Sequence, residues 1–234
     1  MGKRSKASRG KRAAAASGMA VAAVAAGAPT APAASAWVPN APVASRFYAY
    51  AIDWAAGGII SGLPAVLLYA ALTKSQDMFT DLYVFEALGF PWAVGMLAGA
   101  LCVAAAIGYY VVVPWKVWPG QTLGKHLMKL RVARADATAS SVTVPQLLVR
   151  QVIVGFLFEG SAYVVARYIR EMAVLLTRVD VNYYWEIAGM VVTLISAVMA
   201  FVLPARRALH DYLSGTRVVV AEGHPLWEGA AKRS

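Results

Sequence analysis

The sequence contains little charge and almost no cysteine. Charged residues make up 15% of its 234 positions, whereas an ordinary soluble domain has about 25%. Cys102 is the single cysteine, which excludes an internal disulfide framework. With only three histidines to accompany it, a metal cluster of cysteine and histidine ligands is implausible. We therefore expect neither redox chemistry nor a metal site, and no cofactor.

Apolar residues are abundant instead. Hydrophobic residues account for 59% of the chain, and its mean hydropathy is +0.57. This composition excludes a chain that is disordered as a whole and favours a membrane protein over a soluble globule. Four bilayer-spanning helices of ~20–24 residues would use about 90 positions, which leaves no room for a separate soluble enzyme domain. We expect an all-α integral membrane protein that is not an enzyme.

Four apolar windows predict transmembrane helices, at residues 47–72, 89–113, 146–168 and 183–203. Each is about 21–26 residues long, enough at 1.5 Å per residue to cross a hydrocarbon core of about 30 Å. Helices buried in a large soluble protein are the alternative, but aromatic residues at the window ends match the interfacial belt of membrane helices. These aromatic residues are Phe47, Tyr48, Tyr50, Phe90, Trp92, Tyr109, Tyr110, Trp115, Trp118, Tyr183, Tyr184 and Trp185.

Lysine and arginine are distributed unevenly between the connections. The net charge is +10, and most basic residues lie in the N-terminal tail, in the 114–146 connection and near the C-terminus. The connection between the first two windows has Lys74 against three acidic residues. Because basic residues beside membrane spans favour the cytoplasmic side, we expect both termini and the middle connection in the cytoplasm. The connection between the third and fourth windows is mixed in charge, and residues 169–176 are interpreted as a short interfacial helix.

Both ends of the chain are predicted to be cytoplasmic tails, at residues 1–45 and 221–234. The first tail begins with basic residues, continues as alanine and glycine, and ends in a proline-rich stretch. Such a segment buries too little surface to offset its chain entropy, so we expect disorder. A cleaved secretory signal ending at Ala34-Ser35-Ala36 is the alternative. Because the basic run lacks interleaved aromatic residues, its expected partner is anionic lipid headgroups and not nucleic acid.

Two short cytoplasmic segments share a pattern. Leucines recur at helical spacing in residues 123–130 and again in 209–213, and each run leads into a few extended residues. Both runs predict short amphipathic helices on the inner leaflet. The likeness suggests a weak internal repeat, although two copies this short do not establish one.

Asp53 lies about two turns inside the first predicted span, where a carboxylate needs a partner, water or a proton. Arg46 is on the same helical face, but about 10 Å away along the axis, so we expect a third group or water between them. Two interpretations stay open. The pair either orients the helices or belongs to an ion or proton site.

Arg150 and Glu159 place two further charges in the third predicted span. Their spacing of nine residues puts them on roughly opposite faces of an α-helix, so their partners are expected on other helices. For Glu159 these are Asp53, Arg46 or Arg150 of a neighbouring copy. A loose span near a protein interface is the alternative.

The segment 120–125 resembles a phosphate-binding loop without satisfying its pattern. Its spacing is one residue short, and His126 follows where serine or threonine is required. His210 and Asp211 are adjacent and so point in different directions on a helix, which weakens a catalytic dyad. We therefore expect neither nucleotide binding nor hydrolase chemistry. The loop motif itself consists of Gly120, Gln121, Thr122, Gly124 and Lys125.

Taken in order, these motifs resemble the RDD family of bacterial membrane proteins. The family is named for one arginine and two aspartates, and the resemblance matches Arg46, Asp53 and Asp211 to them. Arg150 and the segments 120–125, 130–132 and 206–218 carry the rest of the likeness. It covers about residues 44–220, so we take 46–220 as the membrane domain.

The resemblance implies a small multi-pass protein of the bacterial cytoplasmic membrane, and some members are proposed to exchange Na⁺ or another monovalent cation for H⁺. Four spans provide few walls for a pathway, so transport would need a homo-oligomer. The alternative is a scaffold that does not transport and binds other membrane proteins through faces such as Gly95-x-x-x-Gly99. The residues assigned to the hypothetical ion or proton site are Arg46, Asp53, Arg150, Glu159 and Asp211.

Overall fold

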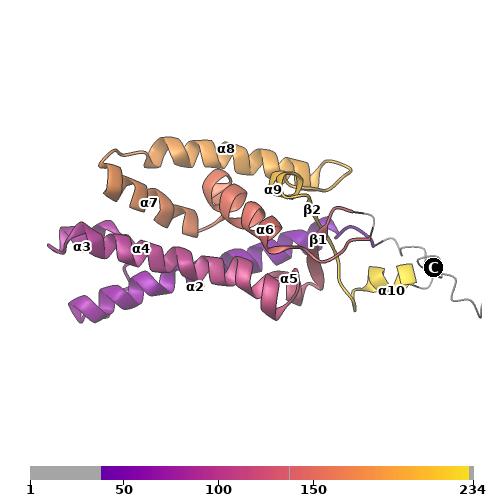
Figure 1. Ribbon diagram of the computed structural model, residues 1–234, viewed down its shortest axis with the longest axis horizontal. Helices are drawn as coiled ribbons and strands as arrows, with labels where there is room; N and C mark the ends of the chain where they lie inside the picture. Colours follow the sequence, from indigo (N-terminus) through magenta and orange to yellow (C-terminus); the bar gives the residue numbers. More distant parts are fainter. Residues whose placement is uncertain (1–37, 137, 232–234) are drawn as a thin grey trace, which may run out of the picture. The chain divides into compact units, whose positions relative to one another are not determined.

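The computed structural model describes residues 38–136 and 138–231, and this part of the chain is mostly helical (Figure 1). The predicted tail over residues 1–37 and its signal-peptide alternative lie outside the described residues. Three described helices are long and apolar enough to cross a membrane: α2 (Val43–Thr73), the continuous helix Trp92–Val117, and α8 (Asn182–Phe201). They coincide with the first, second and fourth predicted windows.

Helix α2 begins after Pro42 and ends at Lys74, whose left-handed backbone lets its N–H bond to the carbonyl of Ala70. Its buried face carries small residues, which allow the second span to approach closely. A Cβ atom added to Gly57 would lie 2.0 Å from the hydroxyl oxygen of Tyr110. The residues just before α2, which were assigned to the tail, pair with strand β2 (Thr216–Val220) through a bridge from Asn40 to Val219. Val38 and Ala41 are buried in the apolar cluster around this strand.

The second span is α4 (Trp92–Ile107) continued by the π-helical segment η1 (Gly108–Val117), and the short helix α3 (Tyr83–Ala87) precedes it. Gly95 and Gly99 face inward. Cβ atoms at these positions would meet Leu82, Met172 and Leu175. The small-residue face proposed as a surface for other membrane proteins is therefore occupied by this chain itself.

The third predicted span is a broken helix. It consists of α6 (Val144–Leu147), the π-helical η2 (Leu148–Phe158), the 3₁₀ turn η3 (Gly160–Ala162) and α7 (Val165–Thr177). The expected continuous helix over 146–168 is interrupted between η2 and α7, and the expected interfacial helix over 169–176 is part of α7, which packs on α4. Side chains satisfy carbonyls at the break: Trp185 Nε1 donates to Leu157 O at 3.0 Å, and Tyr50 Oη donates to Ala162 O at 3.0 Å.

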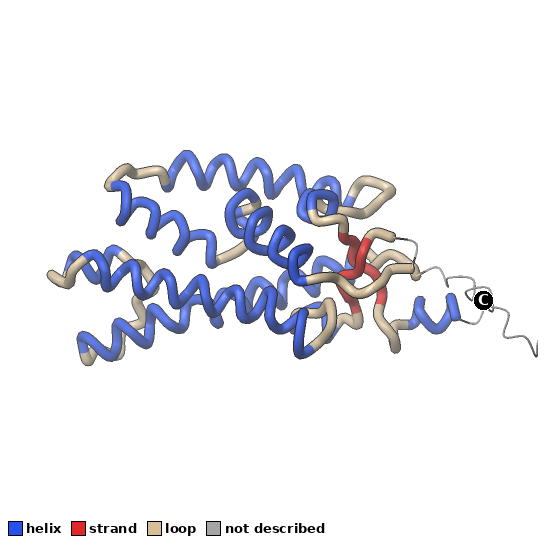
Figure 2. The backbone as a smooth tube through the Cα atoms, viewed as in Figure 1, coloured by secondary structure: helices blue, strands red, loops and turns tan. Residues whose placement is uncertain are grey.

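A small sheet adds strands to the expected all-α architecture. Helix α5 (Leu123–Leu127) leads into β1 (Leu130–Arg134), and α9 (Leu209–Leu213) leads into β2 (Thr216–Val220). The strands pair antiparallel, with Leu130 opposite Val220 (Figure 2). Beyond β2, the predicted C-terminal tail contains the helix α10 (Pro225–Ala231). The sheet, α5 and α9 gather at one end of the long helices (Figure 1).

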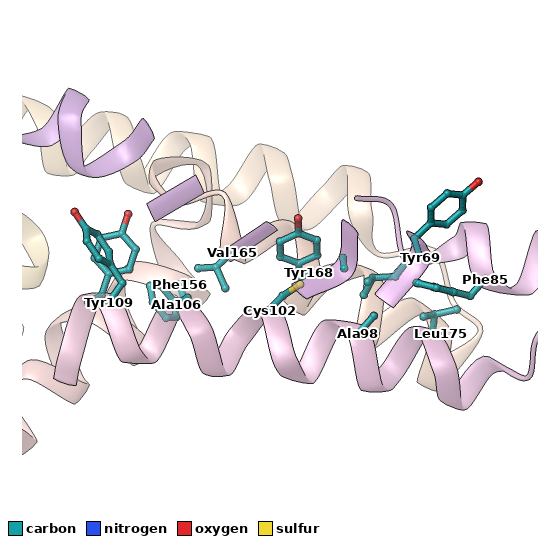
Figure 3. Close-up of a cluster of buried hydrophobic side chains, with 13 residues drawn as sticks. Tyr69, Phe85, Ala98, Cys102, Ala106, Tyr109, Phe156, Val165, Tyr168 and Leu175 are labelled. Atoms are coloured by element: carbon teal, nitrogen blue, oxygen red, sulfur yellow. The ribbon is translucent and has the colours of Figure 1, made fainter. Parts of the chain in front are cut away.

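The main core lies along α4. Ala98, Cys102 and Ala106 recur at four-residue spacing and face side chains from α3, η2 and α7. Figure 3 shows this row beneath Phe156, Val165 and Tyr168, with aromatic rings at both ends. Cys102 is a free, buried thiol. This packing fixes the relative positions of the helices that carry the charged residues.

Candidate functional site

Asp53 is held by the loop motif and a tyrosine. Its Oδ1 accepts bonds from Tyr109 Oη at 2.8 Å and from the Gly124 N–H at 2.7 Å. Its Oδ2 accepts bonds from Thr122 Oγ1 at 2.5 Å and from Lys125 Nζ at 2.8 Å. With Asp53 only 3% exposed, four donors occupy nearly all the acceptor capacity of the carboxylate.

Gly120 and Gly124 of the loop motif lie so close to neighbouring backbone atoms that a side chain would not fit at either position. Gly124 packs against α2, where an added Cβ would lie 2.1 Å from a backbone oxygen. Gly120 has φ +74°, and a Cβ there would lie 2.3 Å from Val132 O. Gln121 Nε2 donates to Leu130 O at 2.8 Å. The motif that resembles a phosphate loop therefore donates hydrogen bonds to a carboxylate of α2, Asp53.

Arg46 makes no direct contact with Asp53, as expected from their spacing, and pairs with Asp211 instead. Its Nη2 lies 3.2 Å from Asp211 Oδ2, and its Nη1 donates to the carbonyl of Arg206. Lys125 takes the place beside Asp53 that was assigned to Arg46. The seven-residue spacing was correctly interpreted as too long for direct contact.

Asp211 is completely buried and receives two arginines. Arg150 Nη1 bonds to Asp211 Oδ1, and Arg46 approaches the other oxygen. Thr216 Oγ1 and the Ala208 N–H also donate to this carboxylate, at 3.3 and 3.0 Å. Burial raises the pKa of Asp211, but the neighbouring positive charges, Arg150 foremost, outweigh burial and hold the pKa well below its usual range. Asp211 is therefore a permanent anion between two cations.

Glu159 pairs with the histidine next to Asp211. Its Oε2 lies 2.7 Å from His210 Nδ1, and its Oε1 accepts bonds from Ser196 Oγ at 2.6 Å and from the His210 N–H at 3.3 Å. All of these partners belong to the same chain, and the expected contacts of Glu159 with a neighbouring copy stay a prediction. His210 and Asp211 do point in different directions, as their adjacency predicts, and each meets its own partner.

Arg150 and Glu159 line one cavity, although α-helical geometry places them on opposite faces. The reason is the π-helical backbone of η2, in which the Glu159 N–H bonds to Val154 O, five residues back. At about 4.4 residues per turn, nine residues make two turns, as seven do in an α-helix. Arg150 in η2 and Glu159 directly after it are therefore about two helical turns apart, as Arg46 and Asp53 are on α2.

The two short helices predicted to be amphipathic, α5 and α9, match each other at corresponding positions. Thr122 and Ala208 both precede their helices with an extended backbone. Lys129 and Gly215 both end them with positive φ, at 53° and 64°. The second residue of each helix donates its backbone N–H to a carboxylate of a long helix, Gly124 to Asp53 and His210 to Glu159. The internal repeat suspected from leucine spacing therefore has a structural counterpart.

These groups surround a cavity of about 190 Å³ whose walls come from α2, η2, η3 and α8. Its polar lining includes charged side chains and the uncharged Gln151, Thr193 and Ser196, and much of the remaining wall consists of alanine and aromatic side chains. Two buried donors on this wall, Arg150 Nε and Thr193 Oγ1, have no hydrogen-bond partner among the described residues. The charged lining residues are Arg46, Asp53, Lys125, Arg150 and Glu159, with His210 beside them.

Sequence reasoning missed several groups that complete the site: Tyr109, Ser196 and Thr216. Each is a hydroxyl-bearing residue that donates to, or bonds beside, a buried carboxylate. In the sequence each of these residues is only a hydroxyl-bearing residue in or beside an apolar helix. Such residues are too common for this feature to identify a site. Within residues 38–136 and 138–231, no group of three histidine, cysteine or acidic side chains could hold a metal ion.

Comparison with known proteins gives one match. A family model described as the RDD family matches residues 40–215. No curated protein and no solved structure matches the chain. The matched range contains every residue of the four pairs described above, Arg46–Asp211, Arg150–Asp211, Lys125–Asp53 and His210–Glu159.

Proposed function

The chain belongs to the RDD family, and from this membership, its long apolar helices and its charged cavity we propose that it is a membrane transporter that moves a small solute in step with protons. We place it in the bacterial cytoplasmic membrane and propose no enzymatic activity. Exposed apolar residues cover the outer face of α8, as a lipid-facing helix requires. They include Met190, Val191, Leu194, Ile195 and Val198.

A four-span topology follows if the broken helix counts as one crossing. The starts of α2 and α6 and the ends of η1 and α8 lie at the sheet end of the molecule (Figure 1). Together η2 and α7 run from this end towards the other, as α2 does, and the helix Trp92–Val117 and α8 run back towards the sheet. The basic connection that contains β1 then lies in the cytoplasm, together with both chain termini.

The break between η2 and α7 is the observation that carries the transport proposal. Irregular backbone within a membrane is tolerated where it lines a cavity, and transporters place their binding sites at such discontinuous helices. Here Glu159 lies at the break, and Glu159, Ala162 and Tyr163 form part of the cavity wall.

Glu159 and His210 are proposed as the proton site in place of Asp53. Four donors bond to the Asp53 carboxylate, so the proposed role of this residue is to hold α2 against the 120–125 loop. Glu159 instead lies 2.7 Å from Nδ1 of His210, whose side chain is partly exposed. Exchange for Na⁺ stays a prediction, with Glu159 Oε2 the oxygen proposed to receive the cation.

Proton flux in proteoliposomes tests this assignment. Glu159→Gln should abolish proton movement driven by a solute gradient, because the amide does not titrate. The matched control is Glu86→Gln, which removes an exposed carboxylate paired with Arg178 and should leave flux unchanged. Wild-type protein that moves no protons with any solute would contradict transport, and full flux in Glu159→Gln would contradict the site.

A scaffold that does not transport is the alternative. The apolar outer face of α8 favours it, because a second membrane protein could pack there as readily as lipid. The two functions differ in flux, which a scaffold lacks, and in recovery of a stable partner or homo-oligomer from mild detergent.

A further inference from the structure

The small sheet fixes the register of the internal repeat. Aligning the short helix α5 with α9 also aligns strand β1 with β2. In this alignment Val132 corresponds to Val218, and these two residues face each other in the antiparallel ladder. A local two-fold axis therefore relates the two segments, and each residue of one segment has a counterpart in the other.

The two carboxylates that these segments contact are bound alike through one oxygen. Asp53 Oδ1 accepts hydrogen bonds from the hydroxyl of Tyr109 and from the backbone N–H of the second residue of α5. Glu159 Oε1 accepts them from the hydroxyl of Ser196 and from the N–H of the second residue of α9. Both hydroxyls come from the long helix that precedes the short one. The repeat thus provides the same two donors to each carboxylate.

The second oxygens have different surroundings. Asp53 Oδ2 accepts hydrogen bonds from the ammonium group of Lys125 at 2.8 Å and from the hydroxyl of Thr122 at 2.5 Å. The counterparts of these two residues in the second segment are Asp211 and Ala208. The second segment therefore provides Glu159 with neither an ammonium group nor a hydroxyl at this place.

Glu159 consequently keeps one acceptor position free. A carboxylate accepts about four hydrogen bonds, and Glu159 has three partner groups, of which only His210 Nδ1 lies at Oε2. Asp53 and Asp211 pair with lysine and arginine, whereas the ion-pair partner of Glu159 among the described residues is His210 alone. The Glu159 side chain retains a small accessible surface and lines the cavity. The position that an ammonium group fills beside Asp53 is therefore open beside Glu159.

The wall of the cavity also favours an ammonium ion. Aromatic faces attract such cations, and five aromatic side chains line the cavity: Tyr50, Trp54, Tyr110, Tyr163 and Phe201. The three tyrosine hydroxyls each donate to a protein oxygen, at 2.9–3.0 Å, which leaves the rings for contact with a ligand. Hard metal cations need several oxygen ligands, whereas an alkylammonium ion needs an acceptor only for its N–H.

We propose that the cavity binds a small alkylammonium ion, which donates an N–H to Glu159 Oε2 and packs its alkyl groups against the aromatic wall. The cavity volume of about 190 Å³ equals the space of about six water molecules, which is enough for such an ion. The proposal deepens the transport function by naming the cation, and it rests on that function for movement across the membrane. Binding itself does not require transport.

Titration of the purified full chain with trimethylammonium chloride tests the proposal without any substitution. This ion has one N–H for the one free acceptor position. Tetramethylammonium keeps the charge but has no N–H, and tert-butanol has a similar shape without charge. Wild-type protein should bind trimethylammonium at least about tenfold more tightly than either reference, because both lose the charge-assisted hydrogen bond. Equal binding of either reference, or no binding of trimethylammonium, would overturn the proposal.

Two pairs of variants locate the bound ion. Glu159→Gln should weaken trimethylammonium binding at least about tenfold, whereas Glu86→Gln, at the surface pair with Arg178, should bind like wild type. Ala197→Phe should abolish binding by filling the cavity, whose wall includes Ala197. Val198→Phe, on the exposed face of the same helix, should leave binding unchanged. Wild-type affinity in Glu159→Gln or in Ala197→Phe would overturn the proposal.

Competition distinguishes the sources of a cation. Displacement of trimethylammonium by an equal concentration of Na⁺ would assign the site to a metal cation and overturn the proposal. Displacement by phosphatidylethanolamine in nanodiscs, but not by phosphatidylglycerol, would make a lipid ammonium group the ligand and overturn the binding of a free ion.

Flux separates this proposal from the transport proposal. Trimethylammonium binding without movement of the ion or of protons in proteoliposomes would leave the ammonium site standing and contradict transport. Proton-coupled flux of another solute without trimethylammonium binding would leave transport standing and remove the ammonium site.

Discussion

At the scale of single residues, each buried carboxylate is held by groups from another part of the chain. Asp53 of α2 accepts hydrogen bonds from the 120–125 loop. Asp211 of α9 forms ion pairs with arginines of α2 and η2. Glu159 contacts Ser196 of α8 and His210 of α9. Because an unpaired charge in an apolar interior is costly, these contacts add to the apolar packing that holds the helices together.

Replacing only one partner of the Asp53–Lys125 pair should lower the unfolding free energy markedly. Asp53→Asn leaves a largely buried ammonium group without its carboxylate, so we expect a loss of about 3 kcal/mol in unfolding free energy. Adding Lys125→Met should restore at least half of this loss, which thermal unfolding in detergent would measure. Glu86→Gln, which breaks a surface ion pair, should leave the melting temperature nearly unchanged. If Asp53→Asn left the unfolding free energy unchanged, Asp53 would not be holding α2 against the 120–125 loop.

The close approach at Gly124 makes a second prediction at this scale. Gly124→Ala places a Cβ against the backbone of α2 and should destabilise the protein by about 1–3 kcal/mol. Gly108→Ala is the matched control, because a Cβ there meets nothing within 4 Å. Equal melting temperatures for the two variants would show that α2 does not press on the loop.

At the scale of elements, the π-helical backbone of η2 decides which residues meet. The extra residue in each turn brings Arg150 and Glu159 onto one cavity, and the following break lets Glu159 reach α9. The matched segments α5–β1 and α9–β2 then close the same end of the molecule, and their strands pair with each other.

The amphipathic helices offer a prediction at this scale. Leu127 of α5 is 59% exposed and Leu130 at the start of β1 is fully buried. Leu127→Asp should therefore weaken contact with the inner leaflet and increase protease cleavage in vesicles, while stability in detergent stays within about 0.5 kcal/mol. Leu130→Asp should unfold the protein in both settings. Unchanged protection of Leu127→Asp would mean that α5 does not rest on lipid.

At the scale of the whole molecule, the proposed topology places the sheet end in the cytoplasm. Cys102 is buried, so a single introduced cysteine can be labelled without removing it. Met78→Cys, at a position 83% exposed between α2 and α3, should react with an impermeant maleimide in intact cells. Ala135→Cys, beyond β1, should react only after the membrane is permeabilised. The reverse pattern would invert the topology.

The sequence by itself determined the protein class, three of the long apolar helices and the family. It also singled out Arg46, Asp53, Arg150 and Glu159 as charges that needed partners. These features are local, since hydropathy, helical periodicity and short motifs are read within one or two turns of a helix.

Only the tertiary structure decided which charges pair. Arg46 meets Asp211 across 165 positions, and Asp53 meets Lys125 across 72. Such pairs depend on how distant helices pack, which no local pattern records. The π-helix in η2 and the break after it also escaped prediction, because the apolar pattern of residues 146–168 is that of one continuous helix. The sequence therefore indicates which groups cannot stay alone in an apolar interior, and helix packing selects their partners.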